Sequence, residues 1–266
     1  MRTMAESRSG AYSAPVTVAR ALVIDDDEDD RASVRMHLED YGVDVLAPDR
    51  QYANVEELAD YAVAQQVDVT ICDHRLQPRQ LAPFFGAEAV AELVKRSHVA
   101  VLVTGYFDMD FDTSIRQYRA HIPALLEREQ LQEPDLLQQT VDTVQREIGG
   151  DISAARRLHR TIVRVGDIAN ENSAPVLDVF IPGWRPSQAV RMPAAVLPEH
   201  LAVDIRRLRG RHLVAQVNVG ALRKEDVFFG AVEDVVEPKD WPVTNWGEGA
   251  SLPEGDGLPA GLFEES

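Results

Sequence analysis

The sequence has 266 residues, of which 45% are hydrophobic and 27% are charged, a composition typical of a globular protein with one or two cores. No run approaches the ~18 consecutive apolar residues that a membrane span requires. The formal net charge of −17 repels a phosphate backbone. These features exclude a transmembrane role and argue against a nucleic-acid surface spread over the whole chain.

The N-terminus and the cysteine content point to a cytoplasmic protein. Residues 1–17 are small and polar and lack the apolar core of a secretory signal, so they are predicted to be a disordered leader. The single cysteine, Cys72, has no companion for a disulfide or a cysteine-based metal site, and it is expected to be a small core residue.

Charge is unevenly distributed along the chain. Residues 1–150 carry a net charge of −13, residues 151–230 carry +4, and residues 231–266 carry −8. With the change in hydrophobic pattern after residue 148, these differences predict a first domain at 18–148, a second at 149–236 and an acidic, Gly/Pro-rich tail at 237–266.

In the first domain, short apolar runs alternate with amphipathic stretches, which is typical of βαβ units on a parallel sheet. Strands are predicted at residues 21–24, 43–47, 67–72, 100–103 and 122–126. Helices are predicted near residues 30–41, 55–64, from 86 onward, 112–120 and 134–148, with Gly42 ending the first and Asn54 capping the second. Because such apolar strands are buried on both faces, we expect helices on both sides of a doubly wound α/β sheet.

The second domain is predicted to be β-rich and to form a small barrel or sandwich. Its β segments lie at residues 161–165, 176–181, 189–192, 212–219 and 227–232, and one helix is predicted at 198–208.

Three predicted strands of the first domain end in polar residues. The first is followed by Asp25, Asp26 and Asp27, the third by Asp73 and the fourth by Thr104. In a doubly wound sheet the carboxyl ends of the strands form the ligand crevice, so we expect these side chains to converge there. Converging carboxylates repel one another and favour a bound cation, and hard oxygen ligands suit Mg²⁺ or Mn²⁺. Such a site can support transfer of a phosphoryl group to a carboxylate.

The motifs LVIDDD at 22–27, ICDHRL at 71–76 and VLVTG at 101–105 together resemble those of the two-component response-regulator receiver domain, over residues 18–148. The resemblance implies a flavodoxin-like fold with five parallel strands. It implies that Asp73 is the phosphoacceptor, that Asp25 and Asp26 bind the metal with the backbone carbonyl of Arg75, and that Thr104 is the switch hydroxyl. It also implies a sensor histidine kinase as partner.

The sequence departs from the family pattern after the fifth strand. The family has a lysine at the end of this strand, usually followed by proline, whereas Glu127 stands at that place here. Arg128, one residue later, is a possible substitute cation, although arginine and lysine differ in reach and geometry. Ala124 stands where the family has an aromatic residue, and the loop from Asp73 to Gly86 is several residues longer than usual.

We therefore expect a signalling protein that accepts phosphate on Asp73 and relays the change to a β-rich domain that binds another macromolecule. Such a protein is a switch and not an enzyme in the ordinary sense. The partner of the β-rich domain is not identified by the sequence, and no helix-turn-helix pattern indicates DNA.

Three alternatives remain open. The missing lysine and aromatic residue favour a pseudo-receiver that acts as an adaptor without phosphorylation. The pair Asp25 and Asp27 also resembles the nucleophile motif of haloacid-dehalogenase-like phosphatases, in which Asp25 attacks and Asp27 is the acid or base. Arginine runs at 156–164 and 206–211, with Phe180 or Trp184, would suit a nucleic-acid-binding barrel, but solvated faces or pairing with carboxylates is the simpler interpretation. His74 is expected to be a solvated loop residue.

Overall fold

The computed structural model describes residues 18–105, 114–171 and 174–236. The described residues up to Val235 belong to one compact unit. The predicted leader at 1–17, the first two residues of the predicted helix at 112–120 and the predicted tail at 237–266 lie outside the described residues. The domain boundaries at 18–148 and 149–236 stay predictions.

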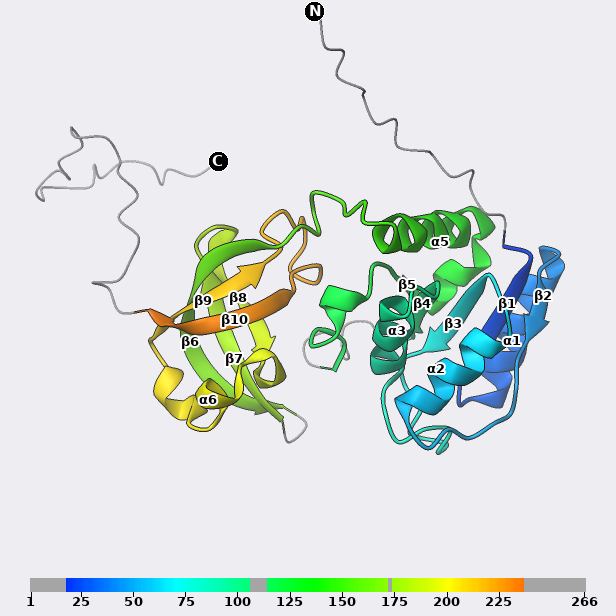
Figure 1. Ribbon diagram of the computed structural model, residues 1–266, viewed down its shortest axis with the longest axis horizontal. Coiled ribbons are helices and arrows are strands. Elements are labelled where there is room, and N and C mark those ends of the chain that lie inside the picture. Colours follow the sequence, from blue (N-terminus) through cyan, green and yellow to red (C-terminus); the bar gives the residue numbers. More distant parts are fainter. Residues whose placement is uncertain (1–17, 106–113, 172–173, 237–266) are drawn as a thin grey trace, which may run out of the picture. The chain divides into compact units, whose positions relative to one another are not determined.

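The first half of the chain contains a five-stranded parallel sheet in the order β2-β1-β3-β4-β5 (Figure 1). This is the flavodoxin-like order, which places a ligand crevice where the strand order reverses, between the first and third strands. The predicted α/β fold class is therefore confirmed. The strands are β1 (Arg20–Ile24), β2 (Asp44–Leu46), β3 (Val69–Asp73), β4 (Ala100–Thr104) and β5 (Leu125–Glu127), and the helices are α1 (Glu28–Asp40), α2 (Val55–Ala64), α3 (Gly86–Lys95) and α5 (Pro134–Ile148).

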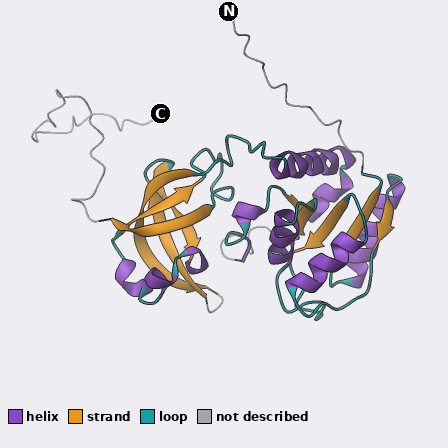
Figure 2. Cartoon of the chain, in the orientation of Figure 1, coloured by secondary structure: helices purple, strands orange, loops and turns teal. Residues whose placement is uncertain are grey.

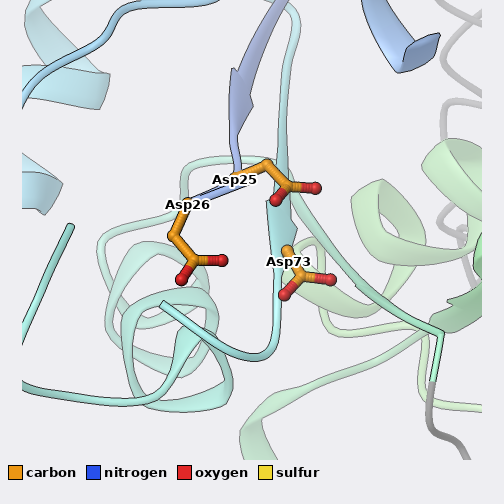
Figure 3. A group of neighbouring side chains, drawn as sticks. All are labelled: Asp25, Asp26 and Asp73. Atoms are coloured by element: carbon orange, nitrogen blue, oxygen red, sulfur yellow. The ribbon is translucent and has the colours of Figure 1, made fainter. Parts of the chain in front are cut away.

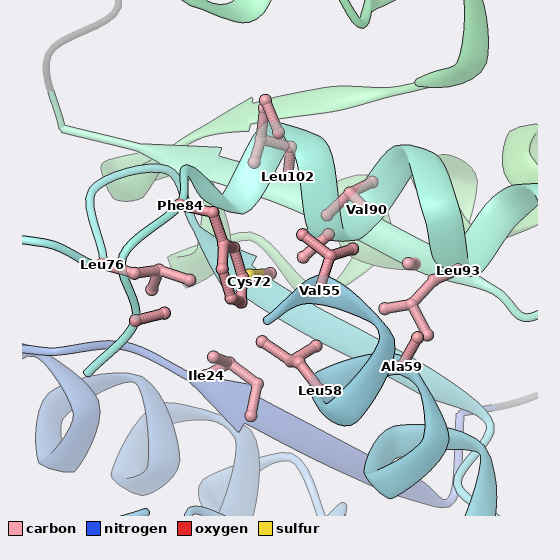
Figure 4. Packing of buried hydrophobic residues seen from close by; sticks show 14 of the residues in the cluster. Ile24, Val55, Leu58, Ala59, Cys72, Leu76, Phe84, Val90, Leu93 and Leu102 are labelled. Carbon is pink, nitrogen blue, oxygen red and sulfur yellow. The ribbon is translucent and has the colours of Figure 1, made fainter. Parts of the chain in front are cut away.

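Helices cover both faces of this sheet, as predicted. Ile24 packs in one buried cluster with residues of α2 and α3, among them Leu58 and Leu93, as Figure 4 shows. Its neighbour Val23 belongs to a second cluster, which contains residues of α1 and α5. Successive strand side chains point to opposite faces, so the two clusters lie on the two sides of the sheet. Each fully buried aliphatic side chain contributes roughly 1.5 to 3 kcal/mol, which makes the strand ends rigid supports.

The helix ends follow local sequence signals. Asp27 caps α1, and its Oδ1 accepts hydrogen bonds from the backbone amides of Asp29 and Asp30 at 2.9 and 3.2 Å. Asn54 caps α2 through the amide of Glu57 at 2.8 Å, as predicted. Gly42, past the end of α1, has a φ of +81°, a left-handed conformation that glycine adopts without strain.

The predicted helix at 112–120 is not continuous over its described residues, 114–120. Ser114 and Ile115 are π-helical, residues 116–118 form a turn, and a short 3₁₀ helix, η2 (Arg119–His121), follows. Arg116 is only 1% exposed and Arg119 only 7%, although arginine side chains are usually exposed. Tertiary contacts of these two guanidinium groups override the local helical preference.

The helix predicted at 198–208 is also wrong in extent. The segment forms a four-residue helix, α6 (Glu199–Ala202), and a separate 3₁₀ helix, η5 (Ile205–Leu208). Asp204 between them has φ −134° and ψ 61°, outside the helical region. Its carboxylate pairs with Arg207 three residues later at 2.5 Å, a local contact at the start of η5.

The second half contains a five-stranded antiparallel sheet in the order β10-β9-β6-β7-β8, which confirms the predicted β-rich part (Figure 2). A register shift between Val165 and Asp167 surrounds Gly166, where a Cβ atom would lie 2.6 Å from the ring of Phe180. Glycine is therefore required at this bend. The strands are β6 (His159–Glu171), β7 (Ala174–Ile181), β8 (Arg185–Pro193), β9 (His212–Val217) and β10 (Phe229–Val236).

Candidate acidic site at the sheet edge

Strand register brings the predicted acidic residues together. Ile24 at the end of β1 lies opposite Cys72 in β3, so Asp25 and Asp73, which follow these residues, lie side by side. Asp26 joins them from the next position along the chain (Figure 3). One carboxylate oxygen from each of the three residues lies within 4.8 Å of the others. Of the side chains predicted to converge, Asp25, Asp26 and Asp73 therefore share one edge of the sheet, and the roles predicted for them stay predictions.

Backbone amides orient each carboxylate. Asp25 Oδ1 accepts from the amide of Asp27 at 2.9 Å, and Asp73 Oδ2 accepts from the amide of Arg75 at 2.7 Å. Asp26 Oδ2 accepts from the amide of Arg79 at 2.8 Å. Each carboxylate keeps a second oxygen for another contact. Fixed carboxylates with remaining acceptor capacity are suited to hold a cation.

Gly86, the first residue of α3, packs against the backbone of Asp73 at the end of β3. The amide of Gly86 donates to the carbonyl of His74 at 2.8 Å, and a Cβ atom on Gly86 would lie 1.8 Å from the carbonyl oxygen of Asp73. Only glycine allows the first residue of α3 to approach the end of β3 this closely.

Arg128 lies in the same pocket. Its Nη2 is 2.6 Å from Asp73 Oδ1 and 3.3 Å from Asp25 Oδ2, and its Nη1 pairs with Asp30. Glu127, which stands where the family has lysine, is exposed, and its side chain caps the 3₁₀ helix η3 (Arg128–Gln132). The predicted substitute cation is thus the side chain that reaches the acidic residues.

Burial makes the carboxylates hard to ionise. Burial first, and the charge of Asp73 second, raise the pKa of Asp25 to about 7. Burial also raises the pKa of Asp73 to about 6, although Arg128 opposes the shift. Both pKa values stay above the ordinary value near 4 because the cost of burying the charged form exceeds the stabilisation that Arg128 and the backbone amides provide.

The side chains present fit a hard divalent cation. Three carboxylates at one sheet edge match the ligand preference of Mg²⁺ or Mn²⁺. Asp25, Asp26 and Asp73 are the residues that would hold the ion, in place of the contacts that Arg128 makes with Asp73 and Asp25. The residue predicted to add a backbone carbonyl, Arg75, lies two positions after Asp73, which its amide contacts.

Thr104 lies beside Asp73. Val103 is opposite Asp73 in the β3–β4 register, and Thr104 is the next residue and the last of β4, with 1% of its surface exposed. The register therefore places Thr104 at the same edge of the sheet as Asp73. Its role as a switch stays a prediction.

Sequence reasoning missed the role of His74. It was expected to be a solvated loop residue, but its exposed fraction is 0%. Its ring stacks on Phe85 with 4.9 Å between ring centroids, and its Nε2 lies 2.8 Å from the hydroxyl of Ser114. The longer loop before α3 supplies Phe85. No periodic signal in a loop could have indicated this contact, so the expectation of a solvated His74 is wrong.

The geometry argues against the phosphatase alternative. Asp27, its acid or base, caps α1 and pairs with Arg79 at 2.5 Å. Hydrogen bonds from the amides of Asp30 and Asp29 lower the pKa of Asp27 despite some desolvation. A carboxylate held ionised by a helix N-terminus is poorly suited to donate a proton.

The arginines of the second half pair within the chain. Arg160 contacts Glu233 at 2.8 Å, Arg209 contacts Asp167 at 2.5 Å, and Arg164 packs over the ring of Phe180 at 4.5 Å. Trp184 donates its indole N–H to the carbonyl of Ala221 at 2.7 Å. These contacts support the simpler interpretation of the arginine runs over a nucleic-acid surface.

Comparison with known proteins gives structural matches only. No protein-family model matches the chain, and no curated protein matches it. A response regulator receiver domain protein from Clostridium thermocellum is 20% identical, with 49% of this chain and 96% of that chain covered and a TM-score of 0.37. Chemotaxis protein CheY4 of Vibrio cholerae is 21% identical, with 48% and 98% covered and a TM-score of 0.35.

A third solved structure, response regulator TrrA from Thermotoga maritima in complex with Mg²⁺ and BeF, is 20% identical, with 47% of this chain and 97% of that chain covered and a TM-score of 0.36. These receiver-domain structures each match about half of this chain. Among the described residues, no helix combines the length and apolar character needed to cross a bilayer.

Proposed function

We propose that the first half of this chain is a phosphoacceptor switch in which Asp73 takes a phosphoryl group from a sensor histidine kinase. The observation that carries the proposal is the convergence of Asp25, Asp26 and Asp73 at one sheet edge, within 4.8 Å and in contact with a cation from Arg128. A signalling role suits such a site best, because a phosphoryl group on Asp73 changes the local charge and leaves the polypeptide chain intact.

In this proposal each residue has a separate task. Asp73 is the nucleophile, because one of its oxygens is fixed by the Arg75 amide at 2.7 Å and the other faces Arg128. Asp25 and Asp26 hold the divalent cation, which offsets negative charge on the incoming phosphoryl oxygens. Arg128 takes the place of the missing lysine and pairs with the phosphoryl group after transfer, and Thr104 offers a hydroxyl beside it.

The experiment is intact-mass spectrometry after incubation with acetyl phosphate and Mg²⁺. We expect a hydroxylamine-labile adduct of one phosphoryl group on the wild-type chain and none on Asp73→Asn. Asp68→Asn is a matched control, because Asp68 accepts hydrogen bonds from Ala19 and Arg20 away from the pocket. An adduct that persists in Asp73→Asn, or no adduct on any variant, would overturn the proposal.

The second candidate is the pseudo-receiver adaptor. One observation favours it: the Nη2 of Arg128 already lies between Asp73 and Asp25, at 2.6 and 3.3 Å, so it partly neutralises the site without a metal. Beryllofluoride with Mg²⁺ distinguishes the two functions. The switch predicts shifted NMR resonances at Asp73 and Thr104, and the adaptor predicts unchanged ones.

A further inference from the structure

The segment at 114–121 contacts both His74, the neighbour of Asp73, and the β-rich half. At its start, the hydroxyl of Ser114 lies 2.8 Å from His74 Nε2. His74 directly follows Asp73, and its own backbone is fixed on two sides: its amide donates to the carbonyl of Val103 at 2.9 Å, and its carbonyl accepts from Gly86 at 2.8 Å. The position of Ser114 is therefore tied to the backbone of the proposed phosphoacceptor.

Two residues further on, Arg116 enters the β-rich half. Its exposed fraction is 1%, and its Nη1 donates to the carbonyl of Val227 at 2.6 Å and to that of Lys224 at 3.2 Å. A buried guanidinium is costly unless its donors meet acceptors. The two carbonyls accept from Nη1 and fix where this end of the side chain lies.

The turn that receives Arg116 is itself rigid. Asn218, with an exposed fraction of 0%, donates from its side-chain amide to the carbonyl of Asp226 at 2.8 Å and accepts from the amide of Phe228 at 2.7 Å. Arg156 packs over the ring of Phe228 at 4.6 Å and pairs with Glu147 of α5 at 2.8 Å. We call the backbone of residues 224–228 the carbonyl socket.

A second arginine strengthens the same contact. Arg119 is 7% exposed, and its Nη2 lies 4.0 Å from Asp226 in the socket. Its backbone carbonyl accepts a hydrogen bond from Arg156 at 3.3 Å. Burial, with the neighbouring charge of Arg156, lowers the pKa of Arg119 to about 9. Side chains from both halves thus contribute to one desolvated polar junction.

We infer that Arg116 in the carbonyl socket is the contact that holds the β-rich half to the α/β half, and that the bond between His74 and Ser114 couples this contact to the state of Asp73. The partner of this surface is the chain's own β-rich half. The coupling step rests on the proposed function, whereas the docking step stands on its own contacts. Linkage requires that a ligand at Asp73 and docking of Arg116 change each other's equilibrium by the same factor.

The docking step is tested by hydrogen–deuterium exchange of the full-length chain. We expect Arg116→Met to speed exchange at residues 224–228 by about tenfold, because two buried carbonyls lose their donor, with β3 unaffected. Arg116→Lys, which keeps the charge but offers a single point donor, should give a smaller increase. Arg35→Met is the matched control, since Arg35 pairs with Glu39 on the surface of α1. Unchanged exchange at the socket in Arg116→Met would overturn the inference.

The coupling step uses Ser114→Ala and a phosphate mimic. Ser114→Ala removes the bond to His74, and we expect faster exchange at the socket, by about threefold. Beryllofluoride with Mg²⁺ should change socket exchange in the wild-type chain and leave it unchanged in Arg116→Met. If the mimic shifts Thr104 but socket exchange is unaltered, the coupling is refuted. If the mimic does not shift the NMR resonance of Thr104, the proposed function fails. The docking step is then still tested by the two Arg116 variants, and the contact between His74 and Ser114 is still tested by Ser114→Ala.

Discussion

Replacing Asp25 by asparagine should stabilise the protein when no divalent cation is present. Asp25 is only 4% exposed, and burial together with the charge of Asp73 raises its pKa to about 7. A carboxyl group whose folded-state pKa exceeds its unfolded value binds its proton more tightly in the folded state. Its contribution to stability is therefore present at low pH and is lost as the pH rises through about 7.

The size of the effect follows from the shift. At pH 8 the difference between 3.8 and about 7 corresponds to roughly 4 kcal/mol of destabilisation by the ionised group. At pH 5 the carboxyl group is protonated in the folded state but mostly ionised in the unfolded state. The unfolded state is therefore still favoured, and the penalty is roughly 2 kcal/mol. Asparagine removes the charge but keeps an oxygen that accepts from the Asp27 amide. We expect Asp25→Asn to gain about 2 to 4 kcal/mol at pH 8 and about half of that at pH 5.

Urea denaturation followed by far-UV circular dichroism, in EDTA at pH 8 and pH 5, measures this gain. Asp27→Asn is the control, because asparagine also caps helices and the pKa of Asp27 is lowered by the Asp30 and Asp29 amides. That variant should be no more stable than the wild-type chain at pH 8. If Asp25→Asn is not stabilised at pH 8, or if its gain does not shrink at pH 5, the pocket does not hold the repelling charges we describe.

Three further outcomes are expected. Gly86→Ala should lower the free energy of unfolding by more than about 3 kcal/mol in urea denaturation, because the new Cβ would lie 1.8 Å from the Asp73 carbonyl oxygen; a smaller loss would show that α3 moves freely. Asn218→Ala should cost about 2 to 4 kcal/mol in the same assay, because the Asn218 side chain satisfies three backbone groups. Cys72 should resist iodoacetamide in the folded chain, since burial, with the charge of Asp73, raises the pKa of its thiol; labelling at the rate of a free thiol, followed by mass spectrometry, would contradict its burial.

The parts of the fold that sequence predicted well depend on local, repeated signals. Ile24 and Cys72 end apolar runs, so the positions of Asp25 and Asp73 at the sheet edge follow from the strand pattern and from parallel topology. Asn54 and Gly42 are helix-end signals within a few residues of the structure they specify. These predictions required no knowledge of contacts between distant segments.

The parts that sequence missed depend on contacts between distant residues. His74 is buried because Phe85, eleven positions later, stacks on it. Arg116 is buried because carbonyls more than a hundred positions away accept its hydrogen bonds. His74 was expected in solvent, which is the usual environment of polar residues, arginine included. Whether a polar side chain is buried depends on whether hydrogen-bond partners surround it, and a single sequence does not show those partners.

The role of Arg128 connects the site to the choice between switch and adaptor. One guanidinium faces the carboxylates of Asp25 and Asp73, and Asp26 lies within 4.8 Å of them, so three carboxylates share one arginine and a divalent cation can offset the charge that the arginine does not. Mg²⁺ at a hundred times its dissociation constant should therefore raise the free energy of unfolding of the wild-type chain by about 2.7 kcal/mol. Arg128→Met should bind Mg²⁺ more tightly, because it loses the internal competitor, and isothermal titration calorimetry would show this. If Mg²⁺ stabilises neither form, the arginine is not a competitor for a metal site, and the adaptor becomes the better account of this sheet edge.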